Sequence, residues 1–166
     1  MKSVAKLVPA FSIAAILALG ACSSEAPDAP EPESEPVQTL QVVERGFDQP
    51  EALADYLSES LDEVQVRLES ESNPDYDEDV DADRLYVDFA SAGKTDEDME
   101  ATAAVVQTVS QATFDFDVLM VTGDSSAGEW SYLYHPRTID ELTRGGQITV
   151  SDVWDAAEQD FDTIHR

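Results

Sequence analysis

The chain has 166 residues, which suits one ordinary domain together with shorter additional segments. Its 36 Asp and Glu residues outnumber 9 Lys and Arg, so the formal net charge is −27 at pH 7. Such a chain repels nucleic acid, because phosphate binding requires clustered Lys and Arg, and the basic residues here are scattered. The only cysteine, Cys22, excludes an internal disulfide and a zinc site built from several thiolates.

The first feature along the chain is an apolar run behind two positive charges. Lys2 and Lys6 precede the apolar residues 7–19, and the small residues Gly20 and Ala21 follow them. This order is typical of a secretory signal peptide that is cleaved after small residues. A spanning helix needs roughly 20 apolar residues, so a retained transmembrane helix is the weaker interpretation.

Cys22 stands directly after the two small residues. The stretch Leu19-Gly20-Ala21-Cys22 resembles the lipobox of bacterial lipoproteins. The resemblance implies that residues 1–21 are a lipoprotein signal peptide and that the Cys22 thiol receives a diacylglyceryl group. In many bacteria the amino group freed by cleavage is acylated as well, and two or three chains, at ~0.8 kcal/mol per buried CH₂, anchor a protein stably. An ordinary secretory signal beside an incidental cysteine is the alternative.

The resemblance also predicts where the protein is found. It implies a cell envelope protein that is anchored in a membrane and faces outside the cytoplasm. Ser23, after the cysteine, is not the aspartate that retains lipoproteins in the inner membrane of enteric-type bacteria. The outer membrane is therefore the expected location in a host with two membranes.

An acidic, proline-rich segment follows Cys22. Pro27, Pro30, Pro32 and Pro36 alternate there with carboxylates, without any apolar periodicity. Proline favours an extended backbone, and repulsion between like charges extends the chain further. We therefore predict that residues 22–46 form a disordered tether holding a domain away from the membrane.

Residues 47–166 carry the periodic apolar patterns of a folded domain. Pro50 followed by Glu51 predicts the start of a helix, because proline suits the first turn and acid favours the helix N-terminus. Residues 64–68 and 85–89 alternate apolar and polar side chains, which predicts two half-buried strands with an acidic loop at 69–83 between them.

The second half of this region continues the alternation of helices and strands. Thr95 to Asp98 resembles a capping box and predicts a helix to about residue 112. Strands are predicted at 116–122 and 129–134, a helical turn at 138–142, and a last helix from Ser151 to about 164. The order α-β-β-α-β-β-α predicts one small α+β domain, with a four-stranded, mainly antiparallel sheet packed against helices.

The acidic loop is the first candidate for chemistry. Asp75, Asp77 and Asp79 offer oxygen ligands of the kind that calcium prefers. Counted from Asp77, however, the sixth position is Ala82 instead of the glycine of an EF-hand, and the twelfth is Asp88 instead of a bidentate glutamate. The loop therefore indicates weak calcium binding at most, and a solvated loop is favoured.

Two serine motifs and one histidine are candidates for hydrolysis. Residues 123–128 resemble the Gly-Asp-Ser-Gly-Gly of trypsin-like proteases but depart from it at Ser126 and Ala127. Ser91-Ala92-Gly93-Lys94 matches the Ser-x-x-Lys of penicillin-binding enzymes but lacks their partner motifs. A hydrolase would need Ser125 or Ser126 beside His135, and turn and strand-end roles are favoured for all of them.

The aromatic residues Trp130, Tyr132 and Tyr134 share one face of a predicted strand. Such a stripe forms either the core beneath a helix, which is commoner, or a surface for a sugar or peptide.

The sequence indicates no cofactor and favours a non-catalytic role. The expected function is a binding, scaffold or accessory module on a lipid-anchored envelope protein. Its partners would be the membrane, through acyl chains on Cys22, and an envelope protein or cell-wall material. A small envelope hydrolase and a calcium- or salt-responsive surface domain are the alternatives.

Overall fold

The computed structural model describes residues 37–42 and 45–165. The predicted signal peptide, Cys22 and most of the predicted tether lie outside the described residues. Within the tether range, Thr39–Gln41 form a strand, β1, so ordered structure begins before the predicted boundary at residue 47.

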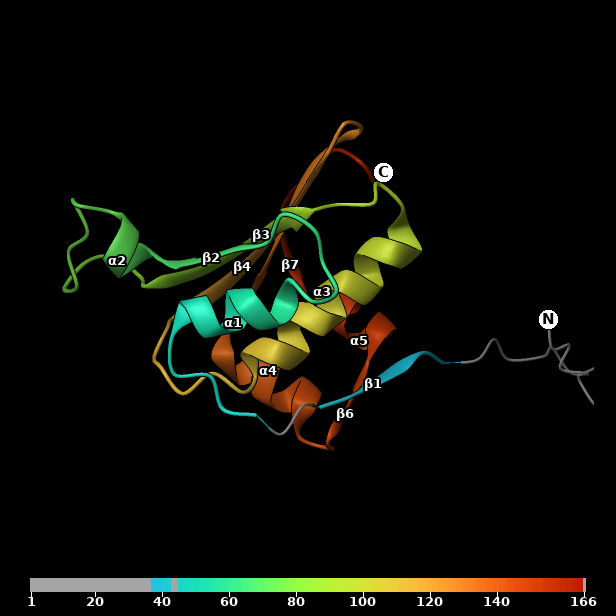
Figure 1. The fold of residues 1–166 in the computed structure, drawn as a ribbon, viewed down its shortest axis with the longest axis horizontal. Coiled ribbons are helices and arrows are strands. Elements are labelled where there is room, and N and C mark those ends of the chain that lie inside the picture. Colours follow the sequence, from blue (N-terminus) through green and yellow to red (C-terminus); the bar gives the residue numbers. More distant parts are fainter. Residues whose placement is uncertain (1–36, 43–44, 166) are drawn as a thin grey trace, which may run out of the picture. The chain divides into compact units, whose positions relative to one another are not determined.

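Helices and strands alternate along the described part of the chain, and the predicted α+β class is confirmed (Figure 1). The helices are α1 (Pro50–Leu57), α2 (Glu69–Ser72), α3 (Thr95–Val109), α4 (Pro136–Thr143) and α5 (Val150–Asp155). The strands after β1 are β2 (Gln65–Leu68), β3 (Arg84–Ala90), β4 (Val118–Ser125), β5 (Gly128–Tyr134), β6 (Gln147–Thr149) and β7 (Glu158–Asp162).

The main sheet has five strands in the order β2-β3-β4-β5-β7, not the four that the sequence predicts. The extra strand is β7, which pairs antiparallel with β5 where a continuous helix to about residue 164 is predicted. The β2–β3 and β4–β5 pairs are also antiparallel. The β3–β4 pair is parallel, because α3 carries the chain back across the sheet between them. A separate two-stranded sheet joins β1 to β6.

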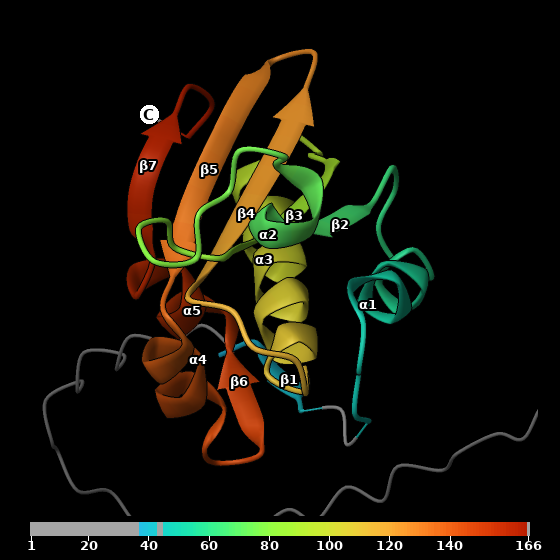
Figure 2. The same ribbon diagram turned by 90° about the vertical axis from the view of Figure 1, so that its left-hand side faces the viewer.

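Four helices cover one side of the main sheet, and among the described helices only the short α2, whose Glu69 accepts a hydrogen bond from Tyr86, reaches the other side. In Figure 1, α1, α3, α4 and α5 all lie on the same side of the strands, and Figure 2 shows α3 running along that face. Alternate residues of β3 (Leu85, Val87 and Phe89) are buried against these helices, while Tyr86 and Asp88 point to the other face and are only half buried. Burial of each large apolar side chain contributes about 1.5–3 kcal/mol. The fold therefore leaves one sheet face open.

The start of α3 differs from the predicted capping box. The helix begins at Thr95, and three acids in its first turn suit the positive end of the helix dipole. Its N-cap residue is Lys94, and no side-chain capping bond forms. Asp98, the predicted partner in the capping box, is buried and turns instead towards Ser91 and Ala92.

Candidate functional site

The aromatic stripe belongs to the core. Trp130, Tyr132 and Tyr134 are all buried beneath the helices, so none of them offers an exposed ligand surface. Their polar atoms also have internal partners. The Trp130 Nε1–H donates to Ser91 Oγ at 3.2 Å, and the Tyr134 hydroxyl donates to the carbonyl of Val153 at 3.1 Å.

The residues of the hydrolase alternative lie at opposite ends of a hairpin. Ser125 pairs with Gly128 at the turn, whereas His135 follows the last residue of β5. At ~3.3 Å per residue, the length of β5 separates them by about 20 Å. The Ser125 hydroxyl donates to the Gly128 carbonyl at 3.3 Å. At the other end of β5, His135 Nε2 lies 3.9 Å from Glu158 Oε1. No nucleophile–base pair forms there.

The acidic loop uses its carboxylates to support its own backbone. The N–H of Asp79 donates to Asp77 Oδ1 at 3.1 Å, and the N–H of Asp77 donates to Asp81 Oδ2 at 3.0 Å. Asp75, Asp77 and Asp79 therefore do not converge on one point. Within residues 37–42 and 45–165, no group of three or more His, Cys, Asp or Glu side chains is placed to hold a metal ion.

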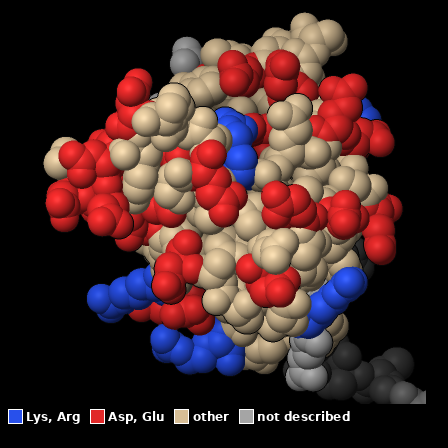
Figure 3. All heavy atoms as spheres, turned by 60° about the vertical axis from the view of Figure 1, so that its left-hand side comes forward, with Lys and Arg blue, Asp and Glu red and all other residues tan. Residues whose placement is uncertain are grey.

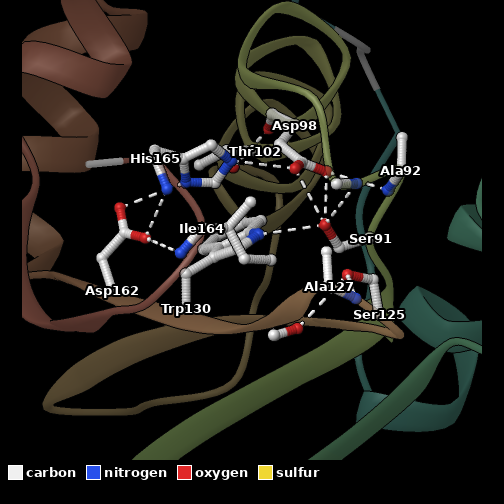
Figure 4. Close-up of polar contacts among 12 residues, drawn as sticks. Ser91, Ala92, Asp98, Thr102, Ser125, Ala127, Trp130, Asp162, Ile164 and His165 are labelled. Atoms are coloured by element: carbon white, nitrogen blue, oxygen red, sulfur yellow. Dashed lines mark hydrogen bonds and ion pairs between the residues drawn. The ribbon is translucent and has the colours of Figure 1, made fainter.

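A buried polar cluster joins α3 to the segment after β7 (Figure 4), and no local pattern in the sequence predicts it. The ring nitrogens of His165 lie between two carboxylates: Nε2 is 3.0 Å from Asp98 Oδ2, and Nδ1 is 3.1 Å from Asp162 Oδ2. The side chains of His165, Asp98 and Asp162 are only 3%, 1% and 6% exposed. Each ring nitrogen of His165 lies within hydrogen-bond distance of one carboxylate oxygen.

Further donors satisfy the two carboxylates of this cluster. The Ser91 hydroxyl lies 2.8 Å from Asp98 Oδ2, and the Tyr132 hydroxyl donates to Asp162 Oδ2 at 2.7 Å. Burial raises the pKa of Asp162, but hydrogen bonds from the His165 N–H, the Tyr132 hydroxyl and the Ile164 N–H outweigh burial and lower it to about 2. Because its charged groups are enclosed and bonded to one another, the cluster is suited to holding the fold together and not to catalysis.

The open sheet face carries a groove of about 400 Å³. At one end, the Arg67 guanidinium lies 4.3 Å from the centroid of the Tyr86 ring and pairs with Asp88. Burial and a hydrogen bond to Glu69 raise the pKa of the Tyr86 hydroxyl. The groove is lined by Arg67, Tyr86, Asp88, Phe89, Met120, Thr122, Asp124, Glu129 and Phe161.

Acidic side chains are spread widely over the surface. Figure 3 shows red Asp and Glu spheres across the visible face, with one blue group near its centre and the others towards its lower and right edges. Asp124 and Glu129 line the groove itself and are exposed. Apolar and aromatic side chains therefore meet uncompensated negative charge in one concave site.

A second groove, of about 430 Å³, lies on the helical side of the fold. Small residues of α3, Ala101 and Ala104, leave room there beside Leu61 and Leu40, and Glu97 and Glu100 stand at its edge. Its one aromatic residue, Phe89, is buried, whereas Tyr86 and Phe161 of the sheet-face groove are partly exposed. We therefore take the groove on the open sheet face as the candidate site.

Comparison of the chain with known proteins identifies no relative. No protein-family model matches the chain, and no curated protein or solved structure matches it either. In the part of the chain that the structure describes, every helix is too short or too polar to cross a bilayer.

Proposed function

We propose that this chain is a lipid-anchored cell-envelope protein whose acidic domain is a non-catalytic binding module. The anchor rests on Leu19-Gly20-Ala21-Cys22, which resembles a lipobox behind a charged and apolar leader. The acyl chains on Cys22 would supply the membrane attachment. In a host with two membranes, Ser23 favours the outer one.

The open sheet face is the observation that carries the binding role. Helices cover one side of the sheet, while Tyr86, Met120 and Phe161 remain partly exposed in a groove on the other. A concave site that combines apolar side chains with a few polar groups is the usual form of a ligand site. The partner would be an envelope protein.

The anchor is tested by the mass of the N-terminal tryptic peptide from the full chain produced in a bacterial host. We expect the peptide to begin at Cys22 and to carry the mass of a diacylglyceryl group, with or without an amide-linked acyl chain. An unmodified Cys22 would contradict the anchor.

The binding role is tested by photocrosslinking in intact cells. A photoreactive phenylalanine analogue replaces Met120 in the groove and, as a control, Glu59, which is exposed beyond α1. We expect one envelope protein to be crosslinked from position 120 but not from position 59, and to be lost when Tyr86→Ala is added. Identical crosslinks from both positions, or none from position 120, would argue against binding at this face.

A further inference from the structure

Two carboxylates at one end of the sheet-face groove stand directly opposite each other. Asp124 of β4 and Glu129 of β5 are cross-strand partners, and both line the groove. Like charges placed directly opposite on a sheet destabilise it. No hydrogen bond or ion pair from the described residues reaches either carboxylate, so this repulsion is uncompensated within 37–42 and 45–165.

The cation at the other end of the groove does not relieve this repulsion. Arg67 pairs with Asp88 and stacks on the Tyr86 ring. Its charge is therefore already matched, and the groove as a whole keeps an excess of negative charge. The site consequently favours a positively charged group beside Asp124 and Glu129.

A buried hydroxyl on the same face has no partner. Ser131 is 0% exposed, and its Oγ makes no hydrogen bond with any described residue. Its neighbours Trp130 and Tyr132 point towards the helices, so Ser131 points to the open face. Its cross-strand partners, Thr122 and Phe161, both line the groove. Ser131 itself does not line the groove, so its hydroxyl lies beneath the groove floor, where an unmade hydrogen bond is a cost to the free domain.

We infer that this groove binds a polypeptide segment bearing lysine or arginine beside an apolar residue. The cationic head would lie between Asp124 and Glu129, and the apolar side chain would pack on Met120 and Phe161. A polypeptide matches both features, the paired carboxylates and the apolar floor, whereas a bare polyamine would leave the apolar floor uncovered. This inference rests on the proposed binding function and assigns the chemistry of its partner.

The test uses the full chain in neutral detergent and capped synthetic peptides as probes. One peptide alternates lysine and valine, and its control alternates glutamate and valine. Titration calorimetry measures the affinity of each peptide. The titrations are made at about 0.15 M salt, where the Debye length of about 8 Å screens long-range attraction between peptide and protein. We expect the lysine peptide to bind and the glutamate peptide not to bind.

Charge variants locate the binding site. Asp124→Asn with Glu129→Gln should weaken the lysine peptide at least tenfold, which is about 1.4 kcal/mol. The matched control, Asp55→Asn with Glu59→Gln, removes the same charges from exposed positions in and after α1 and should change the affinity by less than about twofold. The groove variant should also melt at a higher temperature, because it relieves the repulsion. This outcome separates lost binding from lost folding.

Three results would overturn the inference: equal weakening by both double variants, equal binding of both peptides, or no binding of the lysine peptide. The proposed function fails separately. If the lysine peptide binds through Asp124 and Glu129 but position 120 gives no crosslink in cells, the ligand chemistry stands and the cellular role does not. If position 120 crosslinks one envelope protein and the crosslink is unchanged by Asp124→Asn with Glu129→Gln, the binding function stands and only the inferred class of ligand is wrong.

Discussion

His165 and Asp98 are 67 positions apart, yet their side chains meet at 3.0 Å inside the protein. This contact joins the segment after β7 to the first turn of α3, across the buried indole of Trp130. The edge strand β7 is thus stabilised by its pairing with β5, and the segment after it is stabilised by the contact between His165 and Asp98 of α3.

Replacing either residue of the His165–Asp98 contact should destabilise the domain. His165→Gln and Asp98→Asn should each lower the free energy of unfolding by about 1–3 kcal/mol, because each removes one hydrogen-bond partner from a buried polar group. The double variant should lose less than the sum of the two. Urea unfolding of all four proteins measures this coupling.

A matched surface variant serves as the control. Arg137 pairs with Glu141 on the exposed face of α4, so Arg137→Gln should leave the urea midpoint nearly unchanged. Additive losses for His165 and Asp98 would contradict the coupling.

The low pKa of Asp162 predicts a stability loss in acid. The folded pKa of about 2 lies below the ordinary value of 3.8, so the carboxylate stabilises the fold above pH 4. That contribution, of about 2 kcal/mol, is lost as the pH falls towards 2. Asp162→Asn should therefore be less stable than the unmodified protein at pH 6. Between pH 4 and pH 2, its free energy of unfolding should fall by less than that of the unmodified protein. Chemical unfolding across this range checks the difference in slope, and parallel profiles would count against it.

Gly123 is required by the packing of Trp130. A Cβ added at Gly123 would lie 2.4 Å from Trp130 Cε2, closer than any real contact. Gly123→Ala should therefore destabilise the domain by up to about 3 kcal/mol. Gly145→Ala is the control, because nothing lies within 4 Å of a Cβ there. Thermal melts of both variants test the prediction, and equal melting temperatures would exclude this role for Gly123.

Ser131→Ala should stabilise the unliganded domain. The variant removes a buried hydroxyl that has no partner among the described residues, and we expect a gain of roughly 1 kcal/mol. Thr122→Ala, on the adjacent strand, is the comparison. Lower stability of Ser131→Ala would show that the hydroxyl is satisfied within the protein.

Local patterns in the sequence predicted most of the elements correctly. The helix from Thr95 and the strands around Val87, Val121 and Tyr132 have strong periodicity, and the structure confirms them. The last predicted helix is confirmed only over α5, and its continuation to about residue 164 is wrong, because Val153, Ala157 and Phe161 fall at helical spacing although β7 is a strand. Residues 158–162 form a strand because they pair with the edge of β5. A stretch of a few residues of sequence carries no signal of such long-range pairing.

The candidate site was harder to predict for the same reason. Nothing local links Arg67 to Glu129, and only the order of the strands brings both to one groove. The position of Asp98 in the sequence predicts a role in a helix cap, but the fold buries it against His165. The aromatic stripe was predictable as core, because a strand beneath a helix must bury one face.

The pairing of β1 with β6 has a mechanical consequence. Chain that precedes Thr39 enters the domain through this two-stranded sheet, which has a register of only three residue pairs. A pull from that side would load this short ladder first, before the longer ladders of the main sheet. β1 would detach while the five-stranded sheet, and the groove on its open face, kept their shape.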